Sequence, residues 1–132
     1  AITFQPNGEF MRELSDHKVN ECNEELFVTA LDEVGIGGAN HVYSITFKPK
    51  EGEPDGVSIK FQNGPIKEVG TNGVTHEALL AILIDRLRGF QSGKFACREN
   101  ALALTKLEEA MHWLLHRTRQ RMARGVEGTH SV

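Results

Sequence analysis

The stretch from Arg98 to Arg124 is the longest uninterrupted helical pattern in the chain, and it constrains the fold more than any other segment. Its apolar residues are spaced by four, three and four positions, which places them on one helix face: Ala103, Leu107, Ala110 and Leu114. The same face continues to Arg117 and Arg121. We predict a helix of about 26 residues, roughly 39 Å long, whose last turns face an anion. Cations there also favour the helix dipole without any ligand, so both interpretations stay open.

A second helical pattern runs from about Val74 to Ser92. Thr71 or Asn72 is expected as its N-cap and Gly93 as its C-cap. Its expected core residues are Ala78, Ile82 and Leu83. The turn 93–96 has only about four residues, so the two helices should lie antiparallel as a hairpin.

The first seventy residues are β-rich in character. Segments 26–31, 41–47 and 57–61 have strand composition, and the last two alternate on either side of a loop rich in Pro and Gly, which is typical of a β-hairpin. Residues 2–4 also fit a short strand, whereas 11–25 shows no clear period. We predict an α+β fold in which a small antiparallel sheet of about three strands is followed by a long antiparallel helical hairpin.

These parts are expected to form a single domain, with a β-rich part at 1–70, the hairpin at 71–125 and a tail at 126–132. The tail should be ordered only if something binds it. Because the second helix outruns the first, its far end needs another surface or another subunit. Sequence alone leaves both possibilities open, although a chain of this length would be helped by oligomerisation.

The charge is unevenly distributed along the 132 residues. The net charge is −3, but residues 86–124 contain nine Lys or Arg against three Glu, a balance of +6 that leaves −9 for the rest. A chain that is acidic overall is a poor general binder of DNA or RNA, and a local basic patch better fits a small anionic ligand. Two cysteines, no long apolar run and no signal sequence predict a cytoplasmic protein.

Catalytic constellations are not evident. His112 and His116 share a helix face and would suit two metal ligands, but the Glu of the HExxH motif is missing. Adjacent Glu108 and Glu109 point in different directions. We expect no catalytic residue, no metal and no cofactor.

The turn between the helices has the composition of a nucleotide site. Phe90 and Phe95 lie close in sequence to cationic residues, and Asn100 stands at the start of a helix. Aromatic rings stack on bases, guanidinium groups bind phosphates and an amide reads a base or ribose edge. Alternatively, the two rings only close the end of the hairpin core, and composition does not decide between the two.

From Phe61 to His130 the sequence resembles the phage Thoeris anti-defence sponges of the first type. The resemblance is carried by FQNGPIKEVGTNGVTHEALLAILIDRL, GFQSGKFACRENALALTKLEEAMHWLLHRTRQR and RGVEGTH. The hairpin is also similar to that of the phage anti-CBASS sponge, which traps cyclic dinucleotides. The resemblance implies a non-catalytic protein that sequesters an immune second messenger in the infected bacterial cell.

By matching motifs, the resemblance implies roles for individual residues. Phe90 would stack on the base of glycocyclic ADP-ribose made by a TIR enzyme, Asn100 would hydrogen-bond it, and Arg117 and Arg121 would hold its pyrophosphate. The two pairs lie about five to seven helical turns apart, so antiparallel subunits would share the site.

Some members of these families form hexamers and hold cyclic di- or trinucleotides at a separate place around the interhelical turn. Here the corresponding residues are Arg88, Gly93, Lys94, Phe95 and Ala96. Two other functions remain as alternatives: an enzyme that cleaves cyclic nucleotides, and a protein interaction module anchored on the side of the helix with Trp113 and Leu115.

Overall fold

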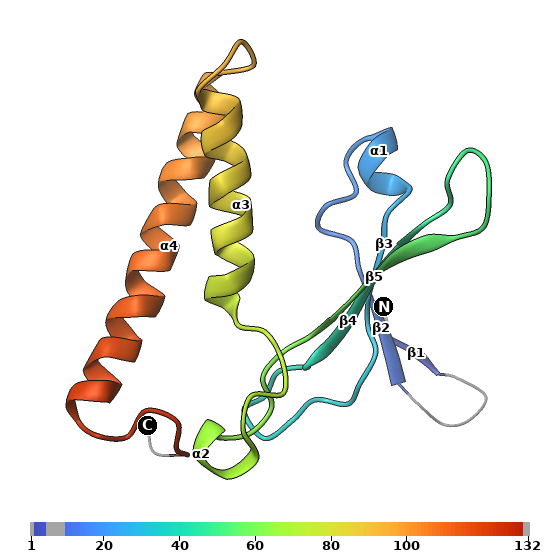
Figure 1. Ribbon diagram of the computed structural model, residues 1–132. Helices are drawn as coiled ribbons and strands as arrows, with labels where there is room; N and C mark the ends of the chain where they lie inside the picture. Colours follow the sequence, from blue (N-terminus) through green and yellow to red (C-terminus); the bar gives the residue numbers. More distant parts are fainter. Residues whose placement is uncertain (1, 5–9, 131–132) are drawn as a thin grey trace. The chain divides into compact units, whose positions relative to one another are not determined.

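The chain divides into two units, residues 1–63 and 64–132, and the computed structural model describes residues 2–4 and 10–130 (Figure 1). The first unit holds an antiparallel sheet and one helical turn, and the second holds a helical hairpin. Their elements, in chain order, are β1 (Ile2–Phe4), β2 (Phe10–Leu14), α1 (Glu21–Glu24), β3 (Phe27–Ala30), β4 (Val42–Phe47), β5 (Asp55–Lys60), α2 (Ile66–Val69), α3 (His76–Gln91) and α4 (Arg98–Ala123).

The sheet is a meander in which every strand pairs antiparallel with its neighbour in sequence. Strands β2 to β5 form its four-stranded body, and β1 adds a short fifth strand beside β2. The three predicted strands are confirmed as β3, β4 and β5, but the expected number of about three was too low. Strand β2 escaped notice because both of its faces mix apolar and charged residues, so that FMREL shows no period of two.

The register of β4 and β5 agrees with the alternation seen in segments 41–47 and 57–61, since it places apolar residues of both strands opposite each other. Tyr43 lies opposite Ile59, and Ile45 lies opposite Val57. The Tyr43 ring also meets that of Phe61 edge to face, with centroids 5.7 Å apart. This face is thinly covered within the described residues, since Val57 is 53% exposed.

The loop between β3 and β4 is closed by the side chain of Asp32. Its carboxylate accepts hydrogen bonds from the backbone N–H groups of His41, at 3.0 Å, and Val42, at 3.1 Å. The amide of buried Asn40 donates to the Asp32 carbonyl at 2.6 Å and accepts from Arg12 at 2.6 Å. Residues 35–40, GIGGAN, therefore belong to a loop that is held closed by side-chain hydrogen bonds.

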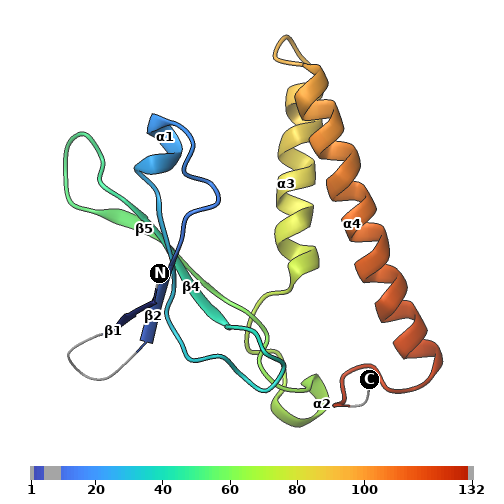
Figure 2. The ribbon, with the colours of Figure 1, turned by 180° about the vertical axis from the view of Figure 1, so that it is seen from behind.

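The predicted helical hairpin is confirmed, and α3 and α4 lie side by side in both views (Figures 1 and 2). The expected N-cap of α3 was wrong: Thr75 caps it, and its hydroxyl accepts from the N–H of Ala78 at 3.1 Å. The helix ends at Gln91 with Ser92 as its C-cap, one residue before the expected Gly93. α4 is one continuous helix of 26 residues, as predicted.

The inward faces of the two helices differ in part from the prediction. On α3 the buried residue is Ile84, whereas Ala78, Ile82 and Leu83 are exposed. On α4 the expected Leu107 and Leu114 are half-buried, but Ala103 and Ala110 are exposed. The segment ALLAILIDRL is apolar almost all round, so its periodicity could not select one face.

Little apolar surface is fully covered in this chain. Among the described residues, Ala30 and Ile84 are the only buried hydrophobic ones. Large apolar side chains of the hairpin that remain exposed include Ile82, Leu83, Leu102, Trp113 and Met122. Within the described part of the chain, no helix is long and apolar enough to cross a membrane.

Candidate functional site

The end of α3 and the turn that follows it carry two aromatic rings and two cations. The rings of Phe90 and Phe95 meet edge to face with centroids 6.3 Å apart. The Arg86 guanidinium lies 5.1 Å from the centroid of Phe90, and the Lys94 ammonium lies 5.5 Å from that of Phe95. Phe90 is half-buried, whereas Phe95 is 65% exposed. The two rings contact each other, and Phe95 remains largely exposed.

Hydrogen bonds from Gln91 fix the shape of this turn. Its side-chain amide donates to the Cys97 carbonyl and its side-chain oxygen accepts from the Cys97 N–H, both at 3.1 Å. Cys97 is in turn the N-cap of α4, because its sulfur accepts from the backbone N–H of Asn100 at 3.4 Å. Asn100 itself is half-buried in the first turn of α4. Phe90 and Asn100 are thus positioned at the same end of the hairpin by a preformed turn.

The residues proposed from the sequence for a second ligand lie in or beside the same turn. The Ala96 N–H donates to the Gly93 carbonyl at 3.2 Å, and a Cβ added at Gly93 would meet no atom within 4 Å. Arg88 reaches across to α4, where its guanidinium forms an ion pair with Glu108 at 2.7 Å. Lys94 is therefore the cation most directly placed on the turn.

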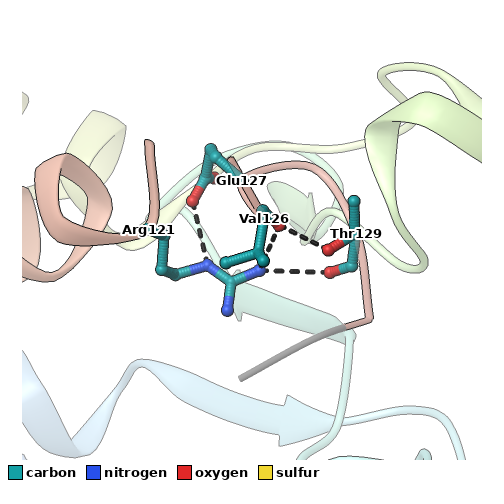
Figure 3. A network of polar contacts seen from close by, with 4 residues as sticks. All are labelled: Arg121, Val126, Glu127 and Thr129. Atoms are coloured by element: carbon teal, nitrogen blue, oxygen red, sulfur yellow. Dashed lines mark hydrogen bonds and ion pairs between the residues drawn. The ribbon is translucent and has the colours of Figure 1, made fainter. Parts of the chain in front are cut away.

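The other two predicted residues, Arg117 and Arg121, lie near the C-terminal end of α4. Arg117 is exposed, but Arg121 is buried, with 7% of its surface accessible. Its Nε donates to the Glu127 carboxylate at 3.0 Å, and its Nη2 donates to the carbonyls of Val126 at 3.0 Å and Thr129 at 3.1 Å (Figure 3). The described part of the tail, to residue 130, therefore folds around Arg121. Residues 131–132 lie outside the described residues.

The structure brings the four predicted residues to two places and not to one. Because α4 is a single helix, Asn100 and Arg117 are separated along its axis by about 26 Å at 1.5 Å per residue. One copy of the chain therefore presents an aromatic and amide end and a separate arginine end.

The face of the hairpin between these ends carries a groove of about 540 Å³. Its lining mixes apolar and charged side chains, among them Ile84, Met111, Leu115, Asp85, Arg88, Glu108 and Arg119. Leu115 faces this groove, whereas Trp113 is 65% exposed and packs edge-on against His112 and His116. The expectation that Trp113 and Leu115 share one side of the helix was wrong, since residues two apart in a helix do not.

The stacked rings of His112 and His116 have centroids 6.2 Å apart, which confirms that they share a face. Within the described residues, no group of three or more His, Cys, Asp or Glu is placed to hold a metal ion.

Residues 53–119 match the family described as the Acb2/Tad1 hairpin domain, which covers half of the chain. The protein belongs to the Acb2/Tad1 hairpin family. A curated relative from Bacillus phage SBSphiJ7, Thoeris anti-defense 1, is 58% identical over 73 residues, or 55% of this chain. That match covers 51% of the relative, about half its length. The resemblance drawn from the sequence motifs is thereby confirmed.

The Acb2/Tad1 hairpin match includes β5, α3 and most of α4, and so contains Phe90, Asn100 and Arg117. Arg121 and the tail that surrounds it lie beyond its end. The contacts of the tail, above all that of Glu127, were missed by sequence reasoning. A carboxylate six residues after a predicted phosphate-binding arginine was the only available signal.

Proposed function

We propose that this protein binds cyclic nucleotide immune second messengers and sequesters them without degrading them. The ligand of the main site is glycocyclic ADP-ribose produced by TIR enzymes, and the protein acts inside the infected bacterial cell. The observation that carries the proposal is the placement of stacking and amide groups at one end of α4 and of two arginines at the other, in a chain homologous to a Thoeris anti-defence protein.

The separation of the two ends favours a site shared between subunits. In an antiparallel pair of hairpins, the Phe90 and Asn100 end of one subunit meets the Arg117 and Arg121 end of its partner. The base would then stack on Phe90 while the pyrophosphate is held by guanidinium groups, which bind such oxygens in bidentate fashion. The exposed apolar side chains on the hairpin supply surface for such an assembly. We propose a dimer that builds a hexamer.

A second ligand class is favoured by the turn itself. Lys94 lies over the exposed ring of Phe95, and the open space at Gly93 lets a ligand approach the backbone. These features suit a cyclic di- or trinucleotide, which offers phosphates to the ammonium and bases to the ring. Substituting Lys94→Gln should remove retention of cyclic dinucleotides and leave retention of cyclic ADP-ribose unchanged.

Retention followed by release tests the main proposal. The protein is mixed with cyclic ADP-ribose isomers and cyclic dinucleotides, unbound ligand is filtered away, and heat denaturation releases what was held. A sponge returns intact ligand in proportion to protein. Altered ligand would indicate an enzyme, and no retained ligand would favour a protein interaction module.

A matched pair of variants connects this result to the site. Arg117→Gln should weaken binding of cyclic ADP-ribose by about 10- to 100-fold, since a charge-assisted contact to the pyrophosphate is lost. Lys106→Gln removes one positive charge from a largely exposed side chain of α4, away from both ends of the helix, and should change binding little. Equal losses in both variants would indicate only a general effect of positive charge.

A further inference from the structure

The C-terminal tail buries the side chain of Arg121 and accepts more hydrogen bonds from its guanidinium than a single surface ion pair would. The side chain of Arg121 is 8% exposed, and that of its partner Glu127 is 40% exposed. One carboxylate oxygen and two backbone carbonyls accept from Nε and Nη2 of the guanidinium (Figure 3). Arg121 is thus the most enclosed cation at this end of the hairpin.

The tail has a defined local structure that holds these acceptors in place. It turns back directly after α4, because the Val126 N–H donates to the Arg121 carbonyl at 3.0 Å, and Gly125 has a φ of 73°. A further turn is closed by the N–H of Thr129, which donates to the Val126 carbonyl at 3.1 Å. Backbone and side chain of Arg121 are therefore both bound by the residues that follow it.

The tail is also anchored to α2 within the same unit. The Lys67 N–H donates to the carbonyl of Gly128 at 3.2 Å. Gly128 has a φ of 83°, and a Cβ there would lie 3.4 Å from the Lys67 side chain. His130 lies 3.8 Å from the Glu68 carboxylate. Residues 125–130 thus form a strap between α2 and the end of α4.

The acceptors of the strap use the guanidinium donors that a pyrophosphate would need, and one of them, the Glu127 carboxylate, is an anion like the pyrophosphate itself. A guanidinium binds carboxylate and phosphate oxygens through the same fork of N–H donors. An anion cannot use Nε and Nη2 of Arg121 while Glu127 and the two carbonyls accept from them. A retained carboxylate would also repel the incoming negative charge.

We propose that Glu127 is an internal competitor for the anion site, so that the strap holds Arg121 in the ligand-free protein and a phosphate-bearing ligand must displace it. The inference rests on the proposed role of Arg121 in binding the pyrophosphate. The apparent affinity of the site is then the intrinsic affinity multiplied by the fraction of molecules in which the strap is open. Glu127 thereby sets how tightly the protein binds.

Substituting Glu127→Gln tests this competition, because it keeps the shape of the side chain and removes its charge. Binding of glycocyclic ADP-ribose and of inorganic pyrophosphate should become tighter by at least about fivefold. The matched control is Glu109→Gln, which alters an ion pair with Lys106 on the exposed side of α4 and should leave affinity unchanged. Unchanged or weaker binding by Glu127→Gln overturns the proposal.

A second variant loosens the strap without touching the carboxylate. Gly128→Ala places a side chain at a positive φ and against Lys67, so it should also tighten binding. Trypsin cleavage after Arg124 reports the strap directly. Cleavage should accelerate in both ligand-free variants, and in the wild-type protein when millimolar pyrophosphate is added; protection of Arg124 by pyrophosphate would refute displacement.

The cleavage assay separates the two proposals. If the wild-type protein retains no cyclic ADP-ribose but pyrophosphate still accelerates cleavage after Arg124, the strap competes for an anion and the proposed function is wrong. If cyclic ADP-ribose is retained while cleavage and the affinity of Glu127→Gln stay unchanged, the function stands and the competition is wrong.

Discussion

The rings of Phe90 and Phe95 meet edge to face at an interplanar angle of 80°, one at the end of α3 and the other in the turn that follows. Each ring carries a cation near its face. Edge-to-face pairs of this kind are worth about 0.5 to 1.5 kcal/mol beyond the area they bury. The turn is therefore held by contacts of the chain itself, and under the proposed function such order would reduce the entropy lost on binding.

The proposed function predicts that the two rings serve different ligands. Phe90→Leu should weaken binding of glycocyclic ADP-ribose by about tenfold or more, since stacking on a base is worth about 1 to 3 kcal/mol. Phe95→Leu should weaken binding of cyclic dinucleotides instead. Isothermal titration of both variants with both ligands measures this; the same pattern of losses in the two variants would contradict separate roles.

A site shared between subunits makes a prediction that can be tested by mixing. Asn100→Ala and Arg117→Ala should each prevent retention of cyclic ADP-ribose when tested alone at protein concentrations below the weakened dissociation constant. Unfolding and refolding the two variants together yields mixed dimers, in which one of the two sites has all its residues intact. Random pairing should restore about a quarter of the wild-type capacity. Absence of any recovery, with mixed dimers shown by mass spectrometry, would place each site within one subunit.

The sequence predicted the hairpin because its signals are local. Helical periodicity extends along the whole of α4, and the link at 93–96 is short, so the two helices must be antiparallel. The positions of Phe90 and Arg117 at opposite ends of the hairpin follow from these two features alone. The roles of these residues in binding stay predictions. The buried face of α3 around Ile84 was missed, because Ile82 and Leu83 beside it are equally apolar.

The environment of Arg121 could not be predicted in the same way. The carbonyls of Val126 and Thr129 accept from its guanidinium, and every residue type carries such a backbone group. Strand β2 was hidden for a related reason, since its place depends on backbone pairing with β3 and not on side-chain alternation. Sequence patterns indicate which side chains are apolar. These two features depend instead on which backbone groups the folded chain brings next to Arg121 and next to β3.

The two hydrogen bonds between the Gln91 side chain and the Cys97 backbone, together called the Gln91 clamp, predict that turn stability and binding are linked. Gln91→Ala removes both hydrogen bonds to Cys97, and should lower the free energy of unfolding by about 1 to 2 kcal/mol. Affinity for both ligand classes should fall together, because Phe90, Lys94 and Asn100 all lie on elements that the clamp joins. Urea titration and calorimetry measure the two effects. Gln120→Ala, at an exposed position of α4, is the control and should change neither.

Asp32 predicts a pH dependence of stability in the first unit. Burial alone would raise the pKa of its carboxyl, but hydrogen bonds from the N–H groups of His41 and Val42 and from the Asn40 side chain outweigh this and hold the pKa below its ordinary value of 3.8. A group whose pKa is lowered by folding stabilises the folded state above the unfolded pKa. That contribution is present at neutral pH and is lost as the pH falls below 3.8 through the folded pKa.

Asp32→Asn keeps the size of the side chain but replaces one of its acceptor oxygens with a donor that faces the N–H groups of the loop. At pH 7 it should lower the free energy of unfolding by about 1.5 to 3 kcal/mol, the usual range for hydrogen bonds to a charged group. The deficit should shrink as the pH falls below 3.8, because the wild-type carboxyl then becomes protonated as well. Glu33→Gln changes an exposed neighbouring carboxylate and should alter stability by less than about 0.5 kcal/mol. A deficit for Asp32→Asn that stays constant from pH 7 to pH 3 would show that the loop is closed by shape and not by charge.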